Sequence, residues 1–215
     1  MGRRGLVRSR GGVPRWPGAL ALLCIGASYL ALSDYVTVVP RLWLPALMTV
    51  LVAALLSAHA WGRYRLARGI SFVLLGVVTA SLVLREFFLV STLSERSASA
   101  FSVLVDAVLI WVGTVVAFAV WYWEIDGGGP DERTSDAHAS EDFLFPQMDQ
   151  QDGKRAIDWT PGFRDYLFVS FTTSSAFGPT DTPVLSGRVK ILTAIQTVLS
   201  LVVVIMLVAW AVGTL

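Results

Sequence analysis

Long apolar runs constrain this chain more than any other feature of its sequence. A helix needs about 20 mostly apolar residues to cross the hydrocarbon core of a bilayer. Hydrophobic residues make up 54% of the 215 residues and charged residues only 15%, whereas soluble domains carry about a quarter charged residues. The sequence therefore predicts an all-α, polytopic transmembrane bundle with about five spanning helices, at 16–35, 42–61, 70–90, 101–123 and 191–215.

Basic residues predict the orientation of these helices. Eight arginines lie in the first 15 residues and between the second and third runs, whereas the opposite connections hold only Arg41 and Arg96. Basic residues that flank membrane helices are enriched on the cytoplasmic side. We therefore expect the N-terminus to lie in the cytoplasm and the chain to return to the cytoplasm after Trp123. The predicted divisions are a basic N-terminus (1–15), a four-helix front (16–123), an acidic flexible cytoplasmic linker (124–164) and a C-terminal part (165–215).

The first run also permits a different interpretation, a secretory signal peptide. Residues 18–32 form an apolar stretch after an arginine-rich start, and Ala31, Leu32 and Ser33 have the small-x-small form of a cleavage site. We favour a transmembrane helix because apolar residues resume after Asp34 and further hydrophobic runs follow.

The linker is acidic and interrupted by apolar islands. Residues 124–165 hold eleven acidic and four basic residues, and their glycines, serines and aspartates are typical of a flexible segment. The islands at 143–146 and at Trp159 are expected to lie against the bundle or the lipid interface. His138 near Glu141 lacks the ligand spacing of a metal site, so we predict no metal there.

One segment near the end of the chain changes character within a few residues. Apolar residues over 166–171 lead into four consecutive hydroxyl side chains at 172–175, and the segment then breaks at Gly178 and Pro179. As a helix, its first twelve residues would span about 18 Å, which is short for a core of about 30 Å. We therefore expect a short re-entrant half-helix within 166–183.

Backbone of this kind typically lines a cavity, because non-helical groups at membrane depth must be shielded by protein or water. In the last helix, Gln196 lies close to a polar face formed by Lys190, Thr193, Thr197 and Ser200. The predicted candidates for a pore or solute path are Thr172, Thr173, Ser174, Ser175, Gly178, Asp181 and Gln196.

The order of these residues resembles part of a known channel. An aromatic-flanked Ser-Phe-Thr-Thr at 170–173, then Phe177 and Gly178, then Asp-Thr-Pro at 181–183 and a long final helix are similar to the pore loop and inner helix of tetrameric potassium channels. The similarity covers about the last fifty residues, with Gly178 as the one filter glycine present. It implies a cation conduit and a homo-oligomer.

A second resemblance covers most of the chain. The apolar front, Phe145-Pro146, the Asp-Tyr-Leu-x-x-Ser-Phe-Thr segment at 165–172 and the Asp-Thr-x-Val-x-Ser-x-Arg run at 181–188 resemble a bacterial family of predicted membrane proteins of unknown function. This resemblance implies a multi-pass protein of the bacterial inner membrane and no particular activity.

Two ionisable residues lie inside predicted helices, where charges usually have a function or a partner. Arg85 and Asp106 lie at nearly equal distances on either side of the turn around Glu95, so we predict an intramembrane charge pair between them. The alternative interpretation is that this pair, and the polar face of the last helix near Gln196, only hold helices together in the bundle.

Two functions remain open. The first is a conduit for a cation or small solute through the re-entrant segment, and the second is a non-transporting scaffold whose acidic loop recruits a cytoplasmic protein. The sequence holds no catalytic constellation at membrane depth, and Cys24 is the only cysteine, so no enzyme, cofactor or cysteine metal cluster is predicted. The expected partners are the lipid bilayer, a second copy of the chain and a cytoplasmic protein, with no nucleic acid.

Overall fold

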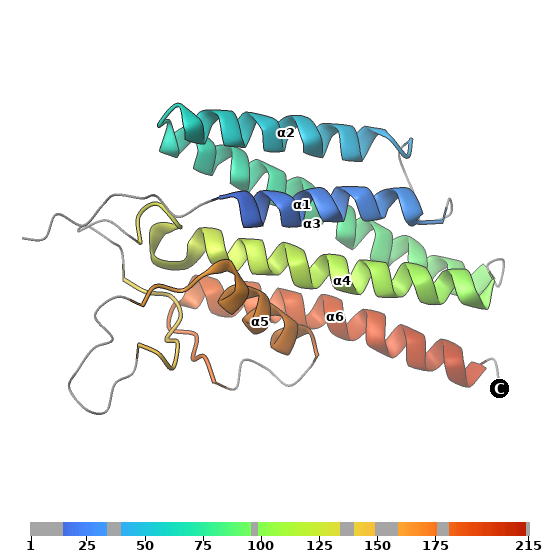
Figure 1. Cartoon of the computed structure of the whole chain (residues 1–215). Helices are drawn as coiled ribbons and strands as arrows, with labels where there is room; N and C mark the ends of the chain where they lie inside the picture. The colour runs from blue at the N-terminus through green and yellow to red at the C-terminus, as the bar shows by residue number, and fades with distance from the viewer. Residues whose placement is uncertain are drawn as a thin grey trace, which may run out of the picture.

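Six α-helices and two 3-10 turns account for most of the described chain (Figure 1). The computed structural model describes residues 15–33, 40–95, 99–133, 140–148, 159–175 and 181–213. The α-helices are α1 (Trp16–Ser28), α2 (Trp43–Ala60), α3 (Tyr64–Glu95), α4 (Ala100–Ile125), α5 (Phe163–Ser174) and α6 (Gly187–Gly213). The turns are η1 (Tyr29–Ala31) after α1 and η3 (Asp126–Gly128) after α4.

Four of the helices are long and apolar enough to cross a membrane. These are α2, α3, α4 and α6, with mean hydropathies between 1.7 and 2.7 in their most apolar windows. The structure thus confirms the predicted helical bundle, although the first run gives a shorter apolar helix over Trp16–Ala31 than the 16–35 that we expected. Its last turn tightens into η1, and Leu32 then adopts an extended backbone, which ends the helix.

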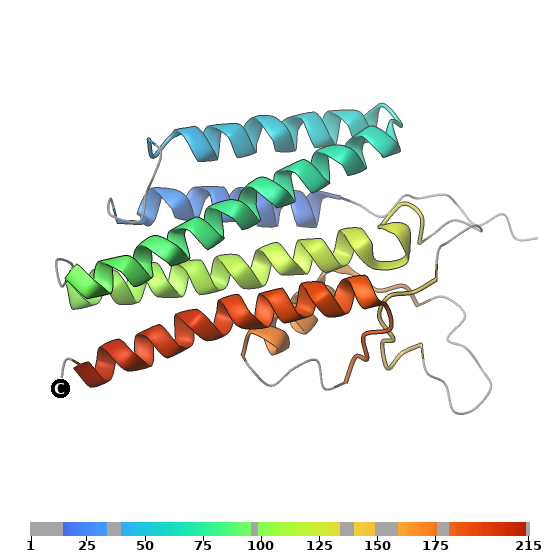
Figure 2. The ribbon, with the colours of Figure 1, turned by 180° about the vertical axis from the view of Figure 1, so that it is seen from behind.

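The helix α4 is the centre of the bundle. It contacts α1 and α3 on one side and α5 and α6 on the other, and no other spanning helix has as large a buried share. Figures 1 and 2 show α2 at the edge farthest from α6, with α4 between them. Three apolar clusters fill the interior, and every one of them includes residues of α4.

Polar residues gather at one end of this bundle, which we call the capped end. Here α1, α3, α5 and α6 begin and α2 and α4 end, while the opposite extremity, the far end, holds the α3–α4 connection (Figure 2). Phe143 and Phe145 are buried at the capped end, so the apolar island at 143–146 packs on the bundle as predicted. The described parts of 124–164 are therefore anchored, whereas we had expected a flexible linker.

The helix α5 reaches only part of the way along the bundle (Figure 1). It starts at the capped end, where the Asp165 carboxylate accepts a hydrogen bond of 2.7 Å from the Gly162 N–H, and it ends at Ser174 after 12 residues, about 18 Å. The next helix begins again at the capped end, at Gly187. A short helix separate from the last helix is thus confirmed, while the predicted break at Gly178 and Pro179 lies outside the described residues.

Candidate functional site

Gln196 is the centre of a buried polar hub between α4, α5 and α6. Its side chain is 0% exposed, and its Nε2 donates to the Ser170 carbonyl and hydroxyl, both at 2.8 Å, and to the Ser174 hydroxyl at 2.6 Å. Its Oε1 accepts a hydrogen bond from the Tyr122 hydroxyl of α4. One amide therefore connects all three helices, and a buried amide needs such partners because an unpaired one costs about 1–3 kcal/mol.

The hub continues into the backbone of α4. The Ser170 hydroxyl donates to the Val115 carbonyl at 2.6 Å, and Trp111 Nε1 donates to the Ser174 carbonyl at 3.4 Å. A carbonyl inside a helix has a second lone pair, so it can accept a side-chain hydrogen bond without losing its helical one. These bonds hold α5 close against α4 over the whole of its second half.

The predicted hydroxyl residues divide into two groups. Ser174 contacts the hub, whereas the hydroxyls of Thr172, Thr173 and Ser175 donate to carbonyls within α5 itself, at distances of 2.8 to 3.1 Å. The last carbonyls of a helix have no partner in the helix backbone. Only the Ser175 hydroxyl reaches such carbonyls, those of Phe171 and Thr172, whereas the hydroxyls of Thr172 and Thr173 donate to carbonyls one turn earlier in α5.

The remaining predicted path residues lie apart from the hub. Asp181 is exposed after α5, and Gly178 lies outside the described residues. Among the described candidates, Gln196 and Ser174 are hydrogen-bonded to each other, and Thr173 hydrogen-bonds to Tyr122, the partner of Gln196.

A second network closes the capped end around Asp126, which is 0% exposed. Its carboxylate accepts hydrogen bonds from the Tyr166 hydroxyl and from the backbone N–H of Asp142, the latter at 2.7 Å. Arg133 donates to the Tyr166 hydroxyl at 2.6 Å and lies 3.6 Å from the Asp126 carboxylate. Burial raises the pKa of Tyr166 far above its usual range, so the hydroxyl keeps the proton that it donates.

Residues 140–148 form a strap that joins this network to α6. Asp142 accepts two hydrogen bonds from Arg188, at 2.9 and 2.6 Å, and Phe143 pairs with Val184 in an antiparallel bridge. A bidentate arginine–carboxylate pair fixes orientation as well as distance. The beginning of α6 is therefore held at a set position relative to Asp126 and α5.

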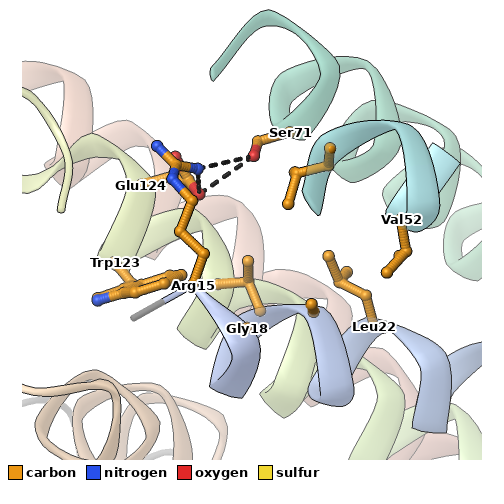
Figure 3. A pocket seen from close by; sticks show the side chains of 10 residues that line it. Arg15, Gly18, Leu22, Val52, Ser71, Trp123 and Glu124 are labelled. Carbon is orange, nitrogen blue, oxygen red and sulfur yellow. Dashed lines mark hydrogen bonds and ion pairs between the residues drawn. The ribbon is translucent and has the colours of Figure 1, made fainter. Parts of the chain in front are cut away.

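The first helix is fastened to the capped end by Arg15 (Figure 3). Its guanidinium donates to Glu124 at 2.7 Å, to Ser71 at 3.2 Å and to Asp131 at 2.7 Å, and the Arg15 and Glu124 side chains are both 2% exposed. Next to this pair lies a cavity of about 10 Å³, close to the smallest space that holds one water molecule. It is too small for a larger ligand.

Arg85 and Asp106 are both buried, but no ion pair joins them in the described chain. The Arg85 guanidinium lies over the Tyr29 ring, 3.9 Å from its centroid, and the Asp106 carboxylate accepts a hydrogen bond of 3.1 Å from the Ser33 N–H. Both side chains therefore contact the connection after α1. Buried oxygen or nitrogen atoms of Arg85, Glu86 and Asp106 have no hydrogen-bond partner among the described residues.

Several members of these networks were not predicted from the sequence. The sequence places Tyr122 and Ser170 at the flank or in the interior of an apolar run, Arg15 in the basic N-terminus and Asp126 in the acidic linker. The sequence does contain a signal for Asp126. Glu124 and Asp126 are acidic residues directly after an apolar run, and a charge that is buried there needs a basic partner. Ser170 gave no such signal, since an isolated serine inside a helix is ordinary.

The described residues contain no group of three or more histidine, cysteine, aspartate or glutamate side chains that could hold a metal ion. The candidate site is therefore the hub around Gln196, together with the half-helix that ends beside it. No family model, curated protein or solved structure matches this chain.

Proposed function

We propose that α4, α5 and α6 form a conduit for a cation or small solute across the membrane. The observation that carries this proposal is the half-helix α5, which starts at the capped end and ends at Ser174 beside Gln196. Gln196 is the tenth residue of α6, about 15 Å from the beginning of that helix, so the hub lies near the middle of a core of about 30 Å.

The electrostatics of the half-helix favour a cation. The carboxyl end of a helix carries a partial negative charge, and half-helices that end inside membranes use this end to coordinate cations in transporters. The hydroxyls of Ser170 and Ser174 and the amide oxygen of Gln196 add neutral oxygen ligands at the same depth. In the arrangement described above these groups bind one another, which corresponds to a closed conduit.

The test is a flux measurement with purified protein in liposomes, using potassium and sodium in separate experiments. Replacing Gln196 by Leu removes the polar hub, and we expect cation flux to fall by about tenfold, the equivalent of one net hydrogen bond of about 1.5 kcal/mol. Thr49→Ala is the matched control, because Thr49 makes an exposed hydrogen bond within α2, away from the hub. Flux no higher than in protein-free liposomes, for every cation and solute tried, would refute the conduit.

Location and orientation are part of the same proposal. We propose a multi-pass protein of the bacterial inner membrane with the capped end in the cytoplasm. The support is the basic residues, because Arg15, Arg63, Arg65 and Arg68 belong to the capped end, whereas Arg41 lies in the opposite connection. A reporter fused at residue 138 should give a cytoplasmic signal, and a periplasmic signal would reverse the orientation.

A non-transporting scaffold is the second candidate. The observation in its favour is that Thr172, Thr173 and Ser175 already satisfy carbonyls of their own helix, so the hydroxyls have a purely structural use. In that case the acidic linker would recruit a cytoplasmic protein. Replacing 149–158 by a neutral linker of equal length should then abolish capture of that protein, and liposome flux should be absent.

A further inference from the structure

The turn between α2 and α3 exposes an unusual combination of side chains. We call residues 61–65 the aromatic–basic turn, in which Trp61 is 76% and Tyr64 51% exposed and Arg63 and Arg65 also face outward. Gly62 has φ +71°, and the N–H groups of Gly62 and Arg63 bond to the His59 and Ala58 carbonyls at 3.0 and 2.9 Å. The backbone is therefore satisfied in a tight helix end, and the side chains remain available.

The length of α2 places this turn at the level of the lipid headgroups. Trp43 is the first of the 18 residues of α2 and Trp61 follows the last, and these residues rise about 27 Å, close to the thickness of the hydrocarbon core. Both tryptophans are more than two-thirds exposed, as residues of the two interfacial aromatic belts are. Arg63 and Arg65 then lie just outside the hydrocarbon, where lipid phosphates lie.

The charges of the turn differ from those of the other arginines at the capped end, apart from the exposed Arg164. Arg15, Arg133 and Arg188 face carboxylates of the protein. Arg63 and Arg65, in contrast, form no ion pair with any residue in the described ranges. Two exposed guanidinium groups next to two exposed aromatic rings thus present positive charge to the membrane surface.

We propose that the aromatic–basic turn is a binding surface for anionic phospholipid headgroups. The planar guanidinium groups of Arg63 and Arg65 would donate paired hydrogen bonds to lipid phosphates, and the rings of Trp61 and Tyr64 would anchor the turn at the interface. The surface belongs to α2 and α3, on the opposite side of α4 from α5 and α6, as Figure 2 shows, so it does not depend on the proposed conduit.

The test is the composition of lipid that stays with the full-length protein. The protein is reconstituted in equal parts of phosphatidylcholine and phosphatidylglycerol, extracted gently, and the retained lipids are counted by native mass spectrometry. We expect enrichment of phosphatidylglycerol. A basic residue near an anionic surface contributes about 1 kcal/mol, or about fivefold, so R63A/R65A should lower the preference by on the order of twentyfold.

Three further measurements make the result decisive. R164A is the matched control, because Arg164 is an exposed arginine at the beginning of α5, and it should leave the preference unchanged. The single variants R63A and R65A should each lower the preference by about fivefold, and they decide the matter if the double variant does not fold. The enrichment should also weaken as salt is added.

An unchanged phosphatidylglycerol preference in the folded double variant would overturn the proposal. So would an equal loss in R164A, since the effect would then reflect total charge and not this turn. A preference lost in the double variant and kept in R164A would establish the surface.

Discussion

The two ends of the bundle differ in how their buried charged side chains are paired. At the capped end, Arg15 and Glu124 lie 2.7 Å apart, and Asp126 accepts hydrogen bonds from a tyrosine and from the backbone. At the far end, Arg85 and Asp106 are as deeply buried, yet neither forms an ion pair in the described chain: the Arg85 guanidinium lies over the Tyr29 ring, and Asp106 accepts one hydrogen bond from the Ser33 N–H.

This difference shows at which end the buried charges connect separate segments of the chain. The capped end joins segments that are far apart in sequence, and each of its charges holds one of them in place. At the far end, Arg85 and Asp106 also contact a segment distant in sequence, the connection after α1, but through one ring contact and one hydrogen bond and not through an ion pair. Removing a charge should therefore be costly at the capped end and much less costly at the far end.

The largest expected effect is that of Asp126→Ala. The change removes the acceptor of the Tyr166 hydroxyl and leaves the buried Arg133 without its carboxylate. Removing one partner of a buried pair typically costs about 3–5 kcal/mol. We expect a loss of this size in the free energy of unfolding, measured by denaturant titration in detergent micelles.

A double variant tests the cause of that loss. If the stranded Arg133 charge is responsible, Asp126→Ala combined with Arg133→Met should be less destabilised than Asp126→Ala alone. Equal or greater destabilisation of the double variant would mean that the backbone contacts of Asp126, and not its charge, hold the capped end.

An intermediate effect is expected from Gly18→Ala. A β-carbon on Gly18 would lie 2.6 Å from Cζ3 of Trp123, and this indole ring is itself buried and packs on Phe163 with a centroid distance of 5.8 Å (Figure 3). Overpacking of a filled site costs about 1–3 kcal/mol. Thermal unfolding should show this loss.

Gly76→Ala is the matched control for that change. Nothing lies within 4 Å of a β-carbon at Gly76, which is inside α3, so helix propensity alone should make this substitution neutral or stabilising by up to about 1 kcal/mol. If Gly18→Ala were equally harmless, the Trp123 ring would be able to move away from Gly18, and this contact would not fix the position of α1 at the capped end.

The smallest effect should come from Asp106→Asn at the far end. Asparagine keeps an oxygen that can accept from the Ser33 N–H, and no ion pair in the described chain is broken. We expect a change within about 1 kcal/mol, clearly smaller than that of Asp126→Asn measured in parallel. Similar losses for the two substitutions would remove the distinction between the ends.

The helices were largely predictable from the sequence because each crossing requires one long apolar run. The runs at 42–61 and 101–123 correspond to α2 and α4 with small shifts of their ends, and the run at 70–90 lies inside the longer α3. The short α5 was predictable too, since its apolar stretch is too short to cross. The anchoring of the strap was not, because it depends on Asp126 and Arg188, which hydropathy treats as solvent-exposed charges.

The proposed Arg85–Asp106 pair illustrates how a small error in register separates two residues. The prediction assumes a turn centred on Glu95, but α3 continues through Glu95 and α4 begins only at Ala100. The residue of α4 level with Arg85 is then Ile110, one helical turn beyond Asp106, or about 6 Å along the axis. Hydropathy locates a helix to within a few residues, and a pairing of charges needs better accuracy than that.

The contacts that α6 makes with the half-helix and with the strap affect the order in which this protein can assemble. The half-helix α5 leaves the ribosome before α6. However, Gln196, which binds α5, and Arg188, which binds the strap, both belong to α6. With only 12 residues, α5 is too short to be retained in the membrane as a spanning helix. Insertion of the terminal helix and seating of the half-helix should therefore be a single late event in biosynthesis, and the bundle of α1 to α4 should form before it.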